Sequence, residues 1–165
     1  VNEHPYANPN RPSDRPSKQT HIAYLRSSSI DPYCSPSTTS IASNMSADEV
    51  AQAFVSHFYQ TFDSNVEGLA GLYSPQSMLT FEGNQVASAD QIMAKLRGIG
   101  AVKHDIKSMD VQPSSNSNAI IIFVTGTIKI GGDNPLHFCE MFQLVSTGPA
   151  AYYVHNDVFR LNYGL

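Results

Sequence analysis

The chain has 165 residues and a formal charge of −4 at pH 7, a size that suits one domain with a core of ordinary volume. Ten Lys/Arg against 14 Asp/Glu argue against nucleic acid as a partner, because an acidic surface repels phosphates. No run approaches the roughly 18 apolar residues that span a bilayer, and the two cysteines form no CxxC. We therefore expect a soluble intracellular protein, without membrane insertion and with both thiols free.

The first 44 residues differ from the rest of the chain in composition. They are rich in Pro, Ser, Thr and Asn and show no sustained periodicity, so we expect residues 1–44 to be a disordered extension and residues 45–165 to be the folded domain. The domain has six Lys/Arg against eleven Asp/Glu, a charge of −5. Met45 directly precedes a helix-start pattern, so one interpretation is that the natural protein starts at Met45 and that residues 1–44 are a foreign extension. The other interpretation is that residues 1–44 are a transit peptide, which their acidic residues and prolines disfavour.

Three helical segments are predicted at the start of the domain. Ser46 and Glu49 have the spacing of a capping box, and apolar residues then recur at intervals of three and four until a stop near 63–65. This buried stripe consists of Val50, Phe54, Val55, Phe58, Tyr59 and Phe62. A shorter helical segment follows at 66–73. Ser88 and Gln91 repeat the capping pattern and open a third helix, which Gly98 and Gly100 end.

Strands make up the remainder. Ser74-Pro75 breaks the helical pattern, and Met78–Phe81 and Gln85–Ala87 form a small hairpin around Gly83-Asn84. Long strands are then predicted at 102–111, 119–130, 136–145 and 151–162. The turn-like segments between them favour antiparallel neighbours.

Helices followed by strands indicate an α+β fold. Strands near a dozen residues long usually bend, so we expect a cone, in which a strongly curved antiparallel sheet wraps three N-terminal helices and leaves an open mouth. The apolar run 119–124 indicates a central strand covered on both faces, one of them by a second subunit. We therefore expect a homodimer packed sheet to sheet.

An enzyme of the isomerase or dehydratase type, using the cone as a small-molecule pocket, is the alternative function. Its only candidates for acid–base chemistry are His104, Asp105, Asp110 and Tyr153. No spacing directs them to one pocket. His137 and Cys139 share a strand face, but a closed zinc site needs four ligands and no second pair exists. We therefore expect no catalytic residue, no metal and no cofactor.

Protein recognition is the favoured function. Phe81 precedes Glu82 at the hairpin turn, where an aromatic ring and an acid lie side by side. Strand residues that converge on the mouth of the cone would complete an apolar pocket with an acidic rim, suited to a partner's aromatic anchor and basic residues. The pocket consists of Phe81, Val102, Leu136 and Phe159, and its rim of Glu82 and Asp133.

Several blocks in the same order resemble the nuclear transport factor two family. They are FVSHFYQTFD (54–63), LAGLYSPQSMLTFEG (69–83), 92–96, 110–113 and 152–163. The resemblance implies a dimeric, non-catalytic carrier that takes the GDP-bound small GTPase Ran from the cytoplasm into the nucleus. It also implies contacts with phenylalanine-glycine (FG) repeats of nucleoporins at the nuclear pore.

The resemblance also implies roles for individual residues. Glu82 is the family's acid beside an aromatic, here Phe81 where many members have Trp. Asp133 is retained in the acidic loop, while Gly131 stands where a second acid is common. The cavity that receives a Ran phenylalanine is lined by Phe81, Val102, Leu136 and Phe159, together with Ile99 in a loop shorter than usual. At the FG-repeat site some members have Trp where this chain has Ala47.

Overall fold

The computed structural model describes residues 45–132 and 134–163. These residues belong to one compact unit, Ser40–Leu165. The disorder expected for residues 1–44, and the rim position expected for Asp133, lie outside the described residues. Within the described ranges, no helix combines the length and apolar character needed to cross a membrane.

The first helix, α1 (Ala47–Ser64), begins as its sequence predicts. The capping box is present, with the Glu49 amide donating to Ser46 Oγ at 3.2 Å and the Ser46 amide donating to Glu49 Oε2 at 2.8 Å. The predicted apolar stripe is buried, except for Phe54, which is half-buried against the core. The second helical segment is a 3-10 helix, η1 (Val66–Leu72).

The hairpin and the third helix differ in detail from the expectation. Strand β1 (Tyr73–Phe81) runs through Ser74-Pro75, where a break was expected, because an irregularity in its pairing between Tyr73 and Met78 accommodates the proline. The turn to β2 (Asn84–Ala87) is Glu82-Gly83, one residue earlier than expected. The capping box expected at Ser88 is wrong: Ser88 precedes α2 (Ala89–Arg97) with a φ of 74° and makes no side-chain cap bond.

Four long strands follow and confirm the predicted order. They are β3 (Val102–Pro113), β4 (Ala119–Ile130), β5 (Leu136–Gly148) and β6 (Ala151–Asn162), each antiparallel to its neighbour. The sheet order is β2-β1-β6-β5-β4-β3. The parallel pairing of β1 with β6 was not foreseen. It joins the hairpin to the long strands, so that β2 and β3 are the two edges of a six-stranded sheet.

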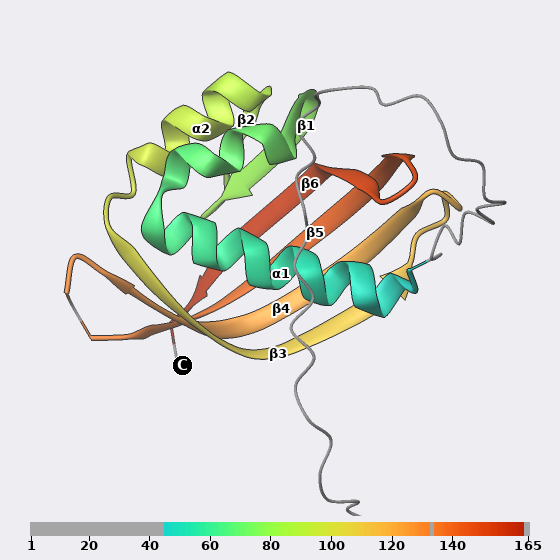
Figure 1. Cartoon of the computed structure of the whole chain (residues 1–165). Coiled ribbons are helices and arrows are strands. Elements are labelled where there is room, and N and C mark those ends of the chain that lie inside the picture. The colour runs from blue at the N-terminus through green and yellow to red at the C-terminus, as the bar shows by residue number, and fades with distance from the viewer. Residues whose placement is uncertain (1–44, 133, 164–165) are drawn as a thin grey trace, which may run out of the picture. The chain divides into compact units, whose positions relative to one another are not determined.

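The two faces of the sheet have different surroundings. Figure 1 shows α1 lying across one face, with the sheet curving beneath it. On this inner face β4 buries Ile122, Val124 and Ile128. Phe123, on the opposite face of β4, is 41% exposed, so none of the described residues supplies the second cover that is expected for this strand.

Candidate functional site

A stack of aromatic rings lies at one end of the inner face, where β1 and β6 run side by side. Phe81 and Phe159 are register partners. Their ring centroids are 4.6 Å apart with planes inclined by 3°. Phe138 on β5 continues the stack, 5.4 Å from Phe159. Phe159 is 3% exposed whereas Phe81 is half-buried, so Phe81 is the end of the stack that meets solvent.

Glu82 is held beside this stack by the turn that it helps to form. Glu82 and Gly83 both have positive φ, 50° and 82°, as a two-residue turn matching the twist of a hairpin requires. The Glu82 amide donates to the Phe159 carbonyl at 3.1 Å, and the Glu82 carboxylate accepts from the Leu161 amide. The carboxylate is therefore fixed against β6, half-buried, with its second oxygen left for another donor.

A cation also reaches the exposed end of the stack. The half-buried Lys95 on α2 places its Nζ over the Phe81 ring, 5.0 Å from the centroid. This cation–π contact positions Lys95 on the same rim as Glu82.

The other predicted pocket residues lie at the same end of the inner face but on different strands. Val102, at the start of β3, pairs with Ile130 and is 8% exposed. Leu136, at the start of β5, pairs with Ile128 and is 37% exposed. Ile99 is partly buried against the core. The structure thus brings Phe81, Glu82 and Phe159 into one cluster and places Val102 and Leu136 across the sheet from it.

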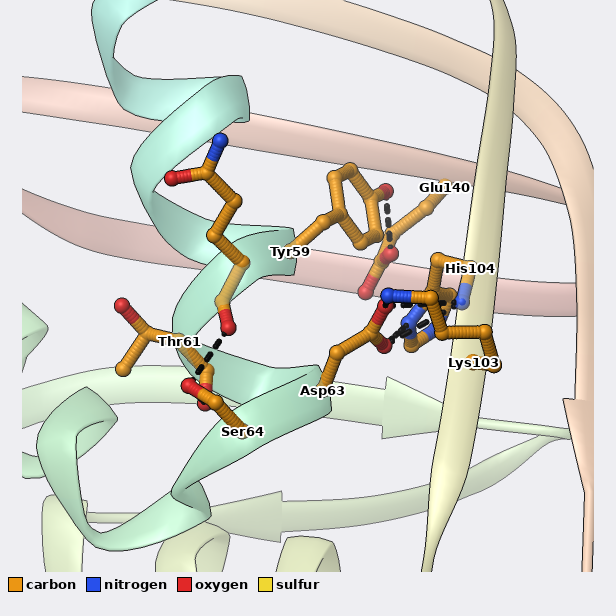
Figure 2. A network of polar contacts seen from close by, with 8 residues as sticks. Tyr59, Thr61, Asp63, Ser64, Lys103, His104 and Glu140 are labelled. Carbon is orange, nitrogen blue, oxygen red and sulfur yellow. Dashed lines mark hydrogen bonds and ion pairs between the residues drawn. The ribbon is translucent and has the colours of Figure 1, made fainter.

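A polar network ties α1 to β3 (Figure 2). The Asp63 carboxylate accepts from the His104 amide at 3.1 Å and lies 2.6 Å from His104 Nδ1. Burial lowers the pKa of His104, with the Asp63 carboxylate opposing the change. The imidazole is therefore neutral near pH 7 and donates its Nδ1 proton to Asp63. Lys103 pairs with the other Asp63 oxygen at 3.2 Å.

Two buried carboxyls, missed in the sequence, lie deeper on the inner face. Tyr59 donates to Glu140 Oε2 at 2.6 Å, and Tyr73 donates to Asp157 Oδ2 at 2.7 Å. Burial raises the pKa of Glu140 well above its ordinary range, and neighbouring Asp157 raises it further. Burial also raises the pKa of Asp157, to about 6. The sequence did indicate that Glu140 faces inward. Glu140 lies midway between the inward-facing Phe138 and Phe142, and alternate residues of a strand point to the same face.

The candidates for acid–base chemistry are scattered. His104 is in the core with Asp63, whereas Asp105 is exposed and paired with Lys107. Asp110 is exposed beside a different hollow, and the half-buried Tyr153 contacts His155. His137 lies in the same register row as Asp105, with Thr127 of β4 between them, and Cys139 lies two residues further along β5. Within 45–132 and 134–163, no three His, Cys, Asp or Glu gather in a way that would hold a metal ion.

Two hollows occur on the surface away from the aromatic stack. One, of about 510 Å³, lies between α1 and β3 and is lined by residues such as Val55, Ile106 and Met109. The other, of about 420 Å³, lies on the outer face of the sheet beside Asp110, Ile121 and Phe123.

These features define a class: an α+β domain whose curved, unclosed sheet wraps a helix, with buried acids that accept hydrogen bonds from tyrosines and an aromatic cluster with an acid at one end. Residues 50–161 match the family model described as the nuclear transport factor 2 (NTF2) domain. The chain belongs to this family, as its sequence blocks indicated.

Relatives that match over their whole length support the assignment. Nuclear transport factor 2 of Oryza sativa is 48% identical over 123 residues, which cover 73% of this chain and 100% of the relative. Nuclear transport factor 2B of Arabidopsis thaliana is 45% identical, covering 73% and 98%. The structure of nuclear transport factor 2 from Cryptosporidium parvum matches with a TM-score of 0.66 at 41% identity, covering 70% and 94%. These relatives support a nuclear transport role for the chain, as a transport carrier rather than an enzyme.

Proposed function

We propose that the chain carries the GDP-bound form of Ran through the nuclear pore, with the aromatic stack and its acidic rim as the Ran-binding site. The observation that carries this proposal is the half-buried Phe81 ring beside the fixed Glu82 carboxylate. An aromatic side chain of Ran packs at this end of the stack, where Lys95 now covers Phe81, and a basic residue of Ran meets Glu82.

The remaining site residues extend this surface. Leu136 supplies exposed apolar area at the same end of the sheet, and Val102 supports it from within. Asp133 is proposed as the second acid on the basis of its sequence position. Because Gly131 replaces a further acid, the rim offers one ion pair fewer, a loss of at most about 1 kcal/mol if that pair is exposed.

A homodimer is the proposed state, packed through the outer sheet face. Phe123, Met141 and Val158 are neighbours across β4, β5 and β6. Met78 lies on the same side of β1 and is 41% exposed, as is Phe123. Such a row of apolar side chains on a sheet face is typical of an interface. A dimer would carry two Ran molecules, one on each inner face.

Passage through the pore is proposed to use FG-repeat nucleoporins, bound weakly and at several points. Helix α1 begins with the exposed Ala47, so this chain offers a methyl group there in place of a large aromatic. We therefore propose that the repeats bind other apolar positions near the start of α1.

The test is a pull-down of Ran in both nucleotide states on the immobilised 165-residue chain. Preferential retention of the GDP form is expected, and Glu82→Lys is expected to reduce it about tenfold or more while circular dichroism stays unchanged. Glu82→Gln keeps an acceptor for the Leu161 amide and removes only the charge, so it separates rim electrostatics from turn stability. Asp90→Lys, the same charge change at an exposed position of α2, is the matched control. Equal retention of both nucleotide states would refute the proposal.

A further inference from the structure

An open hollow lies between α1 and the edge strand β3. Its volume of about 510 Å³ lies within the usual range for ligand sites. Val55 and Tyr59 from α1 face Ile106 and Met109 from β3 across an apolar floor. We call this hollow the α1–β3 groove.

One wall of the α1–β3 groove is an unpaired sheet edge. β3 is the last strand of the sheet, so alternate backbone groups face away from β4. His104 shows this orientation, because its amide donates to Asp63 and not to a strand. By the same alternation Ile106, opposite Gly126, and Met109, opposite Val124, turn their amides outward. Among the described residues these two amides have no strand partner on that side.

The other wall is a polar ridge of α1. Gln52, Ser56 and Gln60 are exposed and spaced by one helical turn, so they follow the groove along its length. A strand edge facing a helix across an apolar floor is the arrangement by which peptide-binding domains accept an added strand.

Cations gather along the strand wall in a domain that is otherwise acidic. Lys103 and Lys107 both line the groove and are 76% and 59% exposed. Each is paired with an acid on the same rim, Asp63 or Asp105. Among the residues that line the groove, these two lysines stand against one acid, Asp63, which leaves the lining with a surplus of one positive charge. The domain as a whole is at −5, so this rim is where it can attract a carboxylate.

We propose that the α1–β3 groove binds an extended segment of a partner protein, added as a strand on β3, with an apolar side chain on its floor and a neighbouring carboxylate at Lys103 and Lys107. Backbone hydrogen bonds to Ile106 and Met109 hold the segment, and the apolar pocket selects its side chain. None of the residues that line the groove belongs to the proposed Ran site, although Tyr59 and His104 of the groove pack against Phe138 of the aromatic stack. A partner can therefore be bound together with Ran.

Lysines and an irregular register also protect sheet edges from unwanted pairing. β3 has both features, with its irregularity between Ile106 and Ser108. Protection alone predicts that no peptide binds, whereas the proposal predicts selective binding, so experiment distinguishes the two.

The test starts from a displayed library of random octapeptides selected on the immobilised full-length chain. Selected peptides are expected to carry an apolar residue flanked by Asp or Glu. By fluorescence anisotropy at low salt, binding should weaken about tenfold in the double variant Lys103→Gln, Lys107→Gln. The control Arg97→Gln, Arg160→Gln removes the same charge outside the groove and should change affinity less than twofold. Failure to select any binder, or equal loss in both variants, would overturn the proposal.

Strand addition is tested separately with N-methylated copies of the best peptide. Methylating the amides of one alternate set should abolish binding, while methylating the other set should leave it within about twofold, because only one set faces β3. Equal binding of both copies would show that only side chains bind and would refute strand addition. Ran retention measured in the presence of the peptide should be unchanged, so failure here is distinguishable from failure of the Ran proposal.

Discussion

Asp157→Asn should change how the stability of the domain depends on pH. Asp157 and Glu140 are buried acids on adjacent strands, and among the described residues neither forms an ion pair with a cation. The groups that face them are Tyr73 from β1, Tyr59 from α1 and, for Glu140, its neighbour Cys139. None of these supplies a positive charge, so burial favours the protonated carboxyls.

The size of the effect follows from the pKa of Asp157, which burial raises from 3.8 to about 6. That difference corresponds to about 3 kcal/mol. Because the folded state holds the proton more tightly than the unfolded state, the contribution is fully present below pH 3.8 and is lost as the pH rises through about 6. Glu140, whose pKa is also raised, extends the loss to higher pH.

Asp157→Asn removes this proton-binding site and keeps an oxygen acceptor for Tyr73. The unfolding free energy of the variant minus that of the wild type should therefore rise by about 2 kcal/mol between pH 4 and pH 7, because part of the full difference is already lost at pH 4. Urea unfolding at several pH values measures this difference, at one protein concentration because the stability of the proposed dimer would depend on concentration. Asp90→Asn, at an exposed position, is the control. Parallel curves for Asp157→Asn and wild type would refute the reasoning.

The remaining predictions concern the core, the outer face and one glycine. Phe159→Ala should lower the free energy of unfolding by about 3–5 kcal/mol, measured by urea unfolding, because the ring is buried between Phe81 and Phe138. If the substitution lowered the free energy of Ran binding by more than the free energy of unfolding, Phe159 would instead line the pocket. Phe123→Glu should yield a folded monomer in sedimentation, and an intact dimer would exclude the outer face. Gly126→Ala should lower the melting temperature, since its Cβ would lie 2.6 Å from the Asp105 carbonyl oxygen; an unchanged value would show that β3 yields easily.

Local patterns predicted the elements well where each element carries its own periodicity. The stripe from Val50 to Phe62 and the capping box at Ser46 specify α1 without reference to the rest of the chain. The parallel pairing of β1 with β6 has no such signal, since it joins segments about 80 residues apart. The irregularity near Pro75 depends on that pairing, because Ser77 Oγ bonds the Val154 carbonyl there.

Within the candidate site, too, the contacts between sequence neighbours were predictable and the contacts between distant segments were not. Phe81 and Glu82 were predictable because a hairpin turn brings neighbours in the sequence together. Burial of Phe159 was not, since it depends on Phe138 from another strand. Asp63 and His104 likewise meet only because β3 returns beneath α1. Glu140 was overlooked although its alternation with Phe138 was visible, because a carboxyl at an inward position is normally excluded.

Separate surfaces allow a carrier to hold several partners at once, and the three surfaces proposed for this chain lie on different parts of the sheet. The aromatic stack uses the β1–β6 end of the inner face, and the α1–β3 groove uses the opposite edge. The outer row through Phe123 points away from both. Glu140 and Asp157 lie in the core between them, where Tyr59 donates to Glu140 and Tyr73 donates to Asp157. A substitution at an exposed residue such as Lys107 or Phe123 should therefore leave the other two surfaces intact, whereas Tyr59 and His104 contact Phe138 and couple the groove to the stack.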